Sequence, residues 1–215
     1  SMCQTADGTI YVATGHGVEG TTGSQNAYDT GANGYGIYTL TRDGNQVTTA
    51  VNHISGTETY SYINEIVCDT INNHIWIATN QGLRRYSAAN GIENISNGLS
   101  AGACNSLAIS KDGSVIVAGM SSGKTNVSTD GGATFLDMTQ SANTPNPING
   151  GASRMEYAIS HERATNGNYY VYAVGGNQYL TGVWMSQDNG VNWTQTAPAN
   201  NQQPGSFAPF TTGGG

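Results

Sequence analysis

A short pattern that occurs twice in the C-terminal half of the chain constrains the fold more than any other sequence feature. The pattern is Ser-x-Asp-x-Gly-x-x-aromatic, and its two copies are Ser128, Asp130, Gly132 and Phe135, and Ser186, Asp188, Gly190 and Trp193. Short strand-like runs flank both copies, as in a β-hairpin, and an aspartate beside a glycine can accept backbone N–H bonds within a tight turn. The pattern therefore predicts two tight turns with solvent-facing aspartates, each followed by a buried aromatic side chain.

Around these turns the sequence repeats a strand-like unit four times. Each unit has a core strand that contains one aligned alanine, namely Ala13, Ala78, Ala118 and Ala173, so that successive alanines are 65, 40 and 55 residues apart. An apolar strand precedes each core strand and two further strands follow it; in the first unit we place the fourth strand at residues 46–51. A recurring unit of four short strands with variable insertions predicts the blades of a β-propeller.

The predicted fold is all-β, a partial β-propeller arc of four four-stranded antiparallel blades at about residues 1–52, 62–98, 105–140 and 154–197. An open arc leaves blade faces unburied at both ends. We therefore expect a fragment of a larger six- to eight-bladed propeller, whose remainder is itself a partner. Residues 198–215 are rich in Gly, Pro and Asn and are interpreted as a linker towards a further blade. A tail folded back on the arc and a compact four-bladed ring remain alternatives.

The aspartate pattern resembles the Asp-box, or BNR repeat, of sialidases, xyloglucan-cleaving glucanases and sortilin-like receptors, all of which are β-propellers. The second unit, from Ile75 to Leu99, also resembles the repeats of bacterial two-component-sensor propellers. The Asp-box resemblance extends over nearly the whole chain and implies the fold together with an extracellular or cell-surface location in a bacterium. An Asp-box stabilises a hairpin and does not itself catalyse a reaction, so the resemblance leaves the function open.

Composition argues against several classes of partner. The 215 residues include 7 basic and 14 acidic side chains, which gives a net charge of −7. Nucleic acid and anionic membranes both require a positive surface, and no apolar run approaches the roughly 18 residues of a membrane span. The four histidines show no paired spacing and no calcium-loop motif is present, so we expect no metal and no cofactor.

Two of the three cysteines, Cys3 and Cys68, occupy equivalent positions in strands that we expect to be buried. Buried cysteines usually behave as small apolar residues. We therefore favour unpaired core residues over a disulfide for Cys3 and Cys68, while the sequence leaves open whether the three cysteines are reduced.

The expected position of a binding site follows from strand direction. Consecutive strands of a blade are antiparallel, so the loops between the second and third strands share one face with the linkers between blades, and the aspartate turns lie on the other. The first face carries the long insertions, at residues 16–35, 53–62, 97–105, 141–154 and 175–181. Long loops on a rigid scaffold commonly bind ligands, so we expect the ligand on this face.

Five side chains are candidates for ligand binding: Tyr35, Glu65, Arg154, Glu156 and Tyr157. Tyr35 offers a flat ring suited to a sugar or peptide, although tyrosines are frequent near strand ends throughout this chain. Glu65 and Glu156 occupy the same position at the start of the innermost strand in two blades. Paired carboxylates are what a glycosidase requires, but these two could equally be solvated strand-end charges or partners of Arg154.

The leading functional hypothesis is a non-catalytic recognition or scaffold propeller that binds protein or glycan through its loop-rich rim. One alternative is a glycoside hydrolase of the Asp-box class whose catalytic blades are incomplete here; no catalytic residue is assigned. The Arg-Ile-Pro segment of sialidases is missing from the sequence, which argues against a complete sialidase site. A sensor-type propeller is the second alternative.

Overall fold

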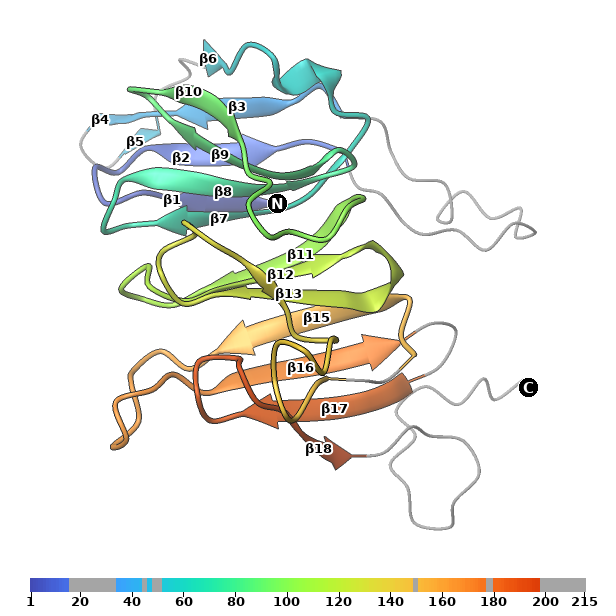
Figure 1. The fold of residues 1–215 in the computed structure, drawn as a ribbon. Helices are drawn as coiled ribbons and strands as arrows, with labels where there is room; N and C mark the ends of the chain where they lie inside the picture. The colour runs from blue at the N-terminus through green and yellow to red at the C-terminus, as the bar shows by residue number, and fades with distance from the viewer. Residues whose placement is uncertain (16–33, 44–45, 48–51, 149–150, 177–179, 198–215) are drawn as a thin grey trace, which may run out of the picture.

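The computed structural model describes residues 1–15, 34–43, 46–47, 52–148, 151–176 and 180–197, and its regular secondary structure is β-strand apart from two short 3-10 helices (Figure 1). The expectations for residues 198–215 and for most of the first insertion lie outside the described residues. The described chain forms four four-stranded antiparallel sheets and one small two-stranded hairpin.

The strands of each sheet follow chain order, and only in the first sheet does a separate hairpin, β4–β5, intervene before the last strand. The first sheet contains β1 (Met2–Gln4), β2 (Ile10–Ala13), β3 (Ile37–Leu40) and β6 (Asn52–His53). The second contains β7 (Ile63–Asp69), β8 (His74–Thr79), β9 (Gly82–Ser87) and β10 (Gly91–Asn94). The third contains β11 (Cys104–Ile109), β12 (Ile116–Met120), β13 (Lys124–Ser128) and β14 (Leu136–Asp137). The fourth contains β15 (Arg154–Ile159), β16 (Val171–Gly176), β17 (Leu180–Ser186) and β18 (Thr194–Ala197).

The four sheets follow one another in chain order, from blue to red in Figure 1. Their first strands are neighbours, because β1 contacts β7, β7 contacts β11 and β11 contacts β15. Four-stranded sheets whose first strands line a common centre are the blades of a propeller. The prediction of an all-β propeller arc with four antiparallel blades is confirmed.

Three apolar clusters hold the neighbouring sheets together. The cluster between the first and second sheets includes Tyr11, Ile37, Ile75 and Ile77; the next includes Trp76, Leu83, Ile116 and Phe135; the last includes Val117, Val171, Trp184 and Trp193. The central strand β12 is buried on both sides, as expected for a strand with a sheet against each face. Strand β16 instead alternates between buried and exposed residues, so the fourth sheet has one uncovered face.

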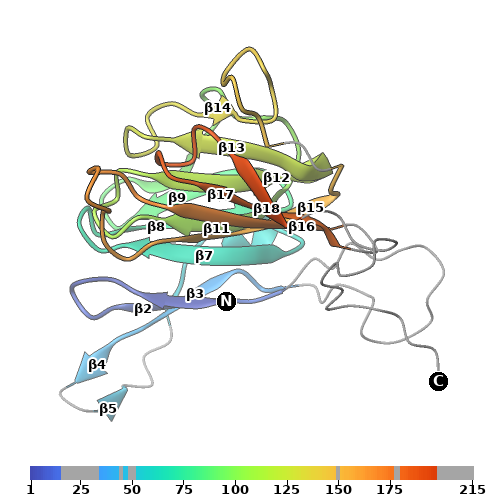
Figure 2. The same ribbon diagram turned by 90° about the horizontal axis from the view of Figure 1, so that it is seen from below.

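The first sheet departs from the sequence prediction at its fourth strand. We expected this strand at residues 46–51, but Gln46–Val47 forms β5, which pairs with β4 (Arg42–Asp43) in a separate hairpin. That hairpin projects from the stack in Figure 2, and the edge of the sheet is completed by β6, in which His53 pairs with Tyr38. Pairing within the hairpin uses the residues that would otherwise have continued the sheet.

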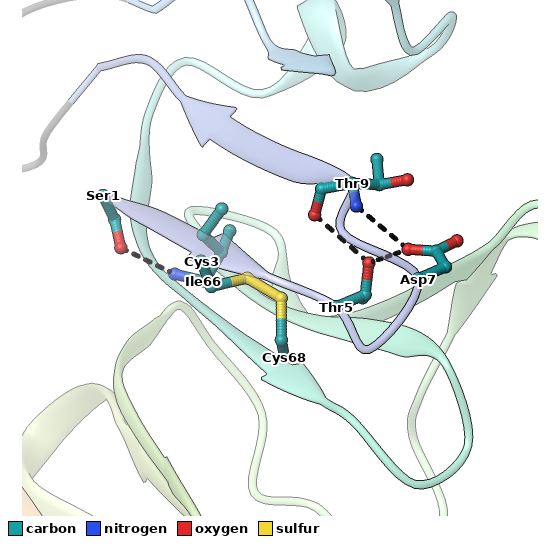
Figure 3. The surroundings of a disulfide bond; sticks show 7 residues. All are labelled: Ser1, Cys3, Thr5, Asp7, Thr9, Ile66 and Cys68. Carbon is teal, nitrogen blue, oxygen red and sulfur yellow. Dashed lines mark hydrogen bonds between the residues drawn. A yellow bond between two sulfur atoms is a disulfide. The ribbon is translucent and has the colours of Figure 1, made fainter. Parts of the chain in front are cut away.

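The prediction that Cys3 and Cys68 are unpaired is wrong, because they form a disulfide between β1 and β7 (Figure 3). Their Cα atoms are 5.7 Å apart, within the range that a disulfide spans. Cys3 and Cys68 occupy equivalent positions on β1 and β7, and these positions meet across the interface between the first and second sheets. The sequence of each strand by itself does not show which side chains meet across this interface. Beside the bond, the N–H of Ile66 donates to Ser1 Oγ at 3.1 Å.

Candidate functional site

The two aspartate turns are built alike and serve the fold. In the third sheet, Ser128 Oγ donates to Asp130 Oδ1 at 2.7 Å, and the N–H groups of Gly132 and Thr134 donate to Ser128 Oγ and Asp130 Oδ1 at 2.8 and 3.0 Å. The Thr134 hydroxyl and N–H are the main causes that lower the pKa of Asp130 from 3.8 to about 2. Phe135, which follows the turn, is only 1% exposed.

The turn of the fourth sheet repeats this network. Ser186 Oγ donates to Asp188 Oδ1 at 2.7 Å, the Gly190 N–H donates to Ser186 Oγ at 3.0 Å, and the Asn192 N–H donates to Asp188 Oδ1 at 2.8 Å. Trp193 is 5% exposed, and its indole N–H donates to the Gly190 carbonyl at 2.8 Å. Both turns are therefore satisfied internally and stabilise their hairpins.

The linkers between sheets contact the residues that follow these turns. The strand directions inferred from the sequence place the linkers and the aspartate turns on opposite faces and do not predict this contact. The N–H of Phe135 donates to the carbonyl of Asn97, in the linker before the third sheet, at 3.0 Å. The N–H of Trp193 donates in the same way to Asn146, in the linker before the fourth sheet, also at 3.0 Å. Each linker therefore runs past the outer strand of the sheet that it enters and fixes that strand to its neighbour.

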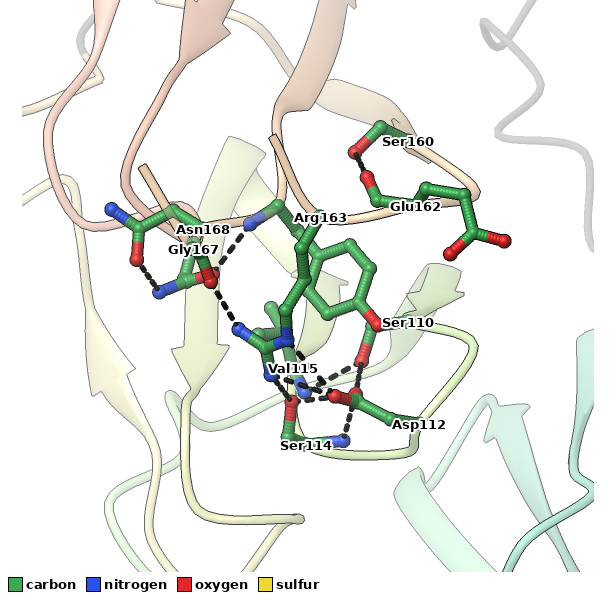
Figure 4. A network of polar contacts seen from close by, with 11 residues as sticks. Ser110, Asp112, Ser114, Val115, Ser160, Glu162, Arg163, Gly167 and Asn168 are labelled. Carbon is green, nitrogen blue, oxygen red and sulfur yellow. Dashed lines mark hydrogen bonds and ion pairs between the residues drawn. The ribbon is translucent and has the colours of Figure 1, made fainter. Parts of the chain in front are cut away.

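A polar network joins the third and fourth sheets at the turns between their first and second strands (Figure 4). Arg163 Nη2 lies 2.6 Å from Asp112 Oδ2, and Arg163 Nη1 donates to the Gly167 carbonyl at 2.7 Å. The guanidinium also lies over the Tyr169 ring, 4.5 Å from its centroid. Because Arg163 is engaged by these partners, it serves as a clamp between sheets.

Sequence reasoning missed a signal in these same turns. Ser110 Oγ donates to Asp112 Oδ1 at 2.8 Å, and in the first sheet Thr5 Oγ1 donates to Asp7 Oδ1 at 2.7 Å. A hydroxyl residue two positions before an aspartate thus marks the turns after β1 and β11 as it marks the hairpin turns after β13 and β17. The repeated Ser/Thr-x-Asp spacing could have identified all four.

The structure brings together three of the five predicted ligand-binding residues, on the inner strands. Arg154 Nε lies 2.6 Å from Glu156 Oε1 on β15. On β7, Glu65 Oε2 accepts the Leu107 N–H of β11 at 2.6 Å. Burial raises the pKa of Glu65, and the nearby Glu156 charge raises it further, while the Leu107 N–H and Arg154 lower it. Glu65 therefore links two inner strands, and the charges of Arg154 and Glu156 act on its pKa in opposite directions.

The other two predicted residues lie elsewhere. Tyr35 is 76% exposed at the loop end of the first sheet, where its N–H donates to Thr14 Oγ1 at 2.8 Å. Tyr157 is turned towards the third sheet, and its hydroxyl lies 2.8 Å from Thr125 Oγ1. Burial raises the pKa of Tyr157. Its hydroxyl is thus an interior contact between sheets, whereas the ring of Tyr35 is accessible to a partner.

A pocket that the sequence did not reveal opens at the loop end, between the third and fourth sheets. It has a volume of about 210 Å³ and is lined by Ser122, Gly123, Lys124, Thr139, Ile148, Gly151, Ala152 and Met155. Polar atoms lie on the third-sheet side, and Met155 and Ala152 supply apolar contacts from the fourth. Such a mixture of apolar walls with a few placed polar groups is characteristic of small ligand sites.

The charged group of this pocket is held in place. Lys124 Nζ donates to Thr139 Oγ1 at 3.0 Å and lies 3.3 Å from Asp137 Oδ2. Burial alone would raise the pKa of Asp137, but hydrogen bonds from Thr139 and the Lys124 charge outweigh burial, so that its pKa lies below the ordinary value. The carboxylate of Asp137 therefore stays charged at neutral pH and pairs with Lys124 Nζ, and the Thr139 hydroxyl bonds to both groups.

The backbone beside Lys124 has an unusual conformation. Ser122 has a φ of 62° and Gly123 a φ of 67°, so two successive residues are left-handed. A Cβ on Gly123 would stand 2.0 Å from the Ala152 carbonyl oxygen, so only glycine fits against the fourth sheet here. The sequence signal for this feature is the short Ser-Ser-Gly-Lys connection between two apolar strands.

Within the described residues, no group of three or more His, Cys, Asp or Glu side chains is placed to hold a metal ion. No helix in that part of the chain is long and apolar enough to cross a membrane.

Comparisons with known proteins bear on the fold. No family model matches the sequence, and no curated protein matches it. Among solved structures, the chain is similar to one in a nidogen/laminin complex, with a TM-score of 0.56 and 15% identity over 79% of this chain and 60% of that one. It also matches the extracellular domain of BT4673 from B. thetaiotaomicron, with a TM-score of 0.46 and 13% identity over 92% of this chain and 33% of that one. The chain thus spans less than two thirds of both, and the first likeness supports the propeller fold alone.

Proposed function

We propose that this chain is a non-catalytic recognition propeller that binds an extracellular protein or glycan at its loop end. The observation that carries the proposal is the pocket beside Lys124, between the third and fourth sheets. Its walls belong to two sheets that the aromatic residues of the turns, the linkers and the Arg163 clamp hold together. A preformed site of this kind can bind a small polar group without first ordering its own side chains.

The chemistry of the pocket favours a hydroxyl-bearing or amide-bearing group over a strongly charged one. Lys124 is already neutralised by Asp137, so a bare anion would have to compete with that carboxylate. Lys124 and the hydroxyl-bearing residues Ser122 and Thr139 line the pocket, so its wall offers both donors and acceptors. The Thr139 hydroxyl already accepts from Lys124 and donates to Asp137. A sugar ring or a polar peptide side chain would satisfy this set, and Ile148 and Met155 would contact its apolar surface.

Two features support an extracellular location and a relation to Asp-box propellers. The Cys3–Cys68 disulfide suits an oxidising compartment, since such bonds are rare in the cytosol. The hydroxyl-to-aspartate network of both hairpin turns agrees with the Asp-box resemblance in the sequence. We infer a secreted or surface-exposed Asp-box protein of bacterial origin.

The proposal can be tested on a glycan array together with a panel of purified surface proteins. Lys124→Ala should abolish or strongly weaken binding of the partner that the unmodified chain selects. Lys111→Ala is the matched control, because Lys111 is an exposed lysine of the same sheet that pairs with Glu162 away from the pocket. Equal binding by both variants and the unmodified chain would refute the pocket as the site.

The glycoside hydrolase remains a second candidate because burial raises the pKa of Glu65 and Glu156 lies close enough to raise it further. A raised carboxyl pKa is what a general acid requires. Against this, Glu65 is bonded to the Leu107 N–H and Glu156 to Arg154. Hydrolysis of β-glucans or sialosides that is lost in Glu156→Gln, with folding intact, would favour the enzyme over the recognition propeller.

A further inference from the structure

The uncovered face of the fourth sheet carries several exposed or half-buried apolar side chains side by side. Tyr172 is 43% exposed and Val174 is 40% exposed. Val183 and Met185 stand beside them on β17, because Val174 pairs with Val183 and Tyr172 with Met185. A groove of about 230 Å³ runs over this face, lined by Glu156, Tyr157, Ala158, Tyr172, Ala173, Val174 and Val183. Neighbouring sheets cover both faces of the second and third sheets. This face of the fourth sheet, by contrast, has no neighbouring sheet among the described residues.

The three linkers between sheets show how such a face is covered. After each fourth strand, the linker places apolar side chains in the cluster on the downstream face of the sheet that it has just left. The residues concerned are Ile54 and Tyr60 after the first sheet, Ile95 and Leu99 after the second, and Ile148 after the third. Ile54 is held closely, since its N–H donates to the Ile37 carbonyl at 2.9 Å. This covering of a sheet face by apolar side chains of the following linker occurs at all three junctions between the described sheets.

The chain continues from the fourth sheet at the margin of the uncovered groove. Ala197, the last residue of β18, pairs with Val183, which lines the groove. Residues 198–215 contain no charged side chain, and their only aromatic residues are Phe207 and Phe210. Phe207 lies ten positions after Ala197, a stretch that extended chain could span over about 33 Å. Tethering also gives such a segment an effective concentration on the order of millimolar at the face.

We propose that the segment around Phe207 and Phe210 docks on this face and covers Tyr172, Val174, Val183 and Met185. It acts in the manner of the three linkers, with aromatic instead of aliphatic side chains. The groove is on the outward face of the fourth sheet, away from the Lys124 pocket, so this docking is separate from the proposed recognition function. A second copy of the chain would be the competing occupant of the same face.

The test compares methyl NMR signals of Val174 and Val183 in the full chain and in two variants. Phe207→Ser together with Phe210→Ser removes both rings, and Thr211→Ser with Thr212→Ser is the matched control in the same segment. Val127, which is buried between the third and fourth sheets, is the internal reference for an intact fold. We expect the Val174 and Val183 signals to lose a ring-current shift in the phenylalanine variant only, equally at low and high protein concentration.

Two results would overturn the proposal. Signals of Val174 and Val183 that are the same in all three proteins would show that the segment does not dock on the face. Shifts that grow with protein concentration, together with a dimer in sedimentation analysis, would assign the face to a second copy. If the Val127 signals also move, the outcome is decided instead with chain 1–206, which lacks both rings and keeps every described residue.

Discussion

The first sheet and the fourth sheet are attached to their neighbours by different means. The fourth sheet is joined to the third by two buried tryptophans, by the linker that bonds Trp193, and by the Arg163–Asp112 clamp. The first sheet has shorter strands and lacks an aspartate turn followed by an aromatic residue. Its polar links to the second sheet include the Ile66–Ser1 contact and one from Asn73 Nδ2 to Asp7 Oδ2 at 3.3 Å, and the Cys3–Cys68 bond reinforces them.

We infer from this difference that the Cys3–Cys68 bond takes the place of the packing by a turn aromatic residue, in the sheet that lacks such a residue. The third and fourth sheets retain the Ser-x-Asp turn and its aromatic side chain, and the Lys124 pocket lies between them. The first sheet keeps the hydroxyl and the aspartate, as Thr41 and Asp43, but lacks the later glycine and the aromatic residue, and the β4–β5 hairpin stands at this place. The part of the arc that keeps the complete turn and its buried aromatic residue is thus the part that presents the candidate site.

The largest expected effect comes from removing the aromatic residue of the fourth-sheet turn. Trp193→Ala should lower the free energy of unfolding by about 3–5 kcal/mol, because the buried indole leaves a cavity between the last two sheets. Chemical denaturation measures the change. Leu136→Ala is the control, since Leu136 follows the equivalent aromatic residue of the third sheet and is exposed. An equal loss in the two variants would contradict the role given to the turn aromatic.

The disulfide should come next in magnitude. The bond closes a loop between residues separated by 65 positions, for which loss of loop-closure entropy corresponds to at most about 4 kcal/mol. Cys3→Ser together with Cys68→Ser should therefore lower the unfolding midpoint in urea. Cys104→Ala keeps the bond and is the control for cysteine removal, although its own cavity has a cost. A double variant as stable as the parent would show that the disulfide does not fasten the first sheet.

A smaller effect is expected at the aspartate of the fourth-sheet turn. Asp188→Ala removes the acceptor of the Asn192 N–H and of the Ser186 hydroxyl, which should cost about 1–3 kcal/mol. Binding at the Lys124 pocket should be unchanged in this variant while it remains folded. Denaturation and binding assays on one preparation separate the two effects, and loss of binding without loss of stability would contradict a purely structural turn.

The smallest effect concerns pH. Hydrogen bonds, from Thr5 above all for Asp7 and from Thr134 for Asp130, lower the pKa of each carboxyl from 3.8 to about 2. Both carboxylates then stabilise the folded chain fully above the unfolded pKa, and this stabilisation is lost as the pH falls from about 4 towards 2. Asp130→Asn should reduce the slope of stability against pH in that window. An unchanged slope would show that the Asp130 turn does not hold the charged form.

Local pattern was enough to predict the four sheets, their strands other than the last strand of the first sheet, and the buried Phe135 and Trp193. These features depend on alternation and turn chemistry within a few residues. The Cys3–Cys68 bond could not be predicted in this way, because it depends on which faces of two inner strands meet. The pocket depends on the left-handed backbone at Ser122 and on the course of a linker past the next sheet, neither of which is a local property. The ligand-binding roles of Tyr35, Glu65, Arg154, Glu156 and Tyr157 stay predictions.

The most direct test of the difference between the two ends of the arc is amide hydrogen exchange, measured with the disulfide oxidised and reduced. Reduction should expose the amides of β2 and β3 to faster exchange and leave those of β12, β13, β16 and β17 protected as before. The buried thiol of Cys104, whose pKa is raised by burial, does not enter the comparison. Uniform loss of protection across all four sheets on reduction, or no change in β2 and β3, would contradict a first sheet that is fastened separately by Cys3–Cys68.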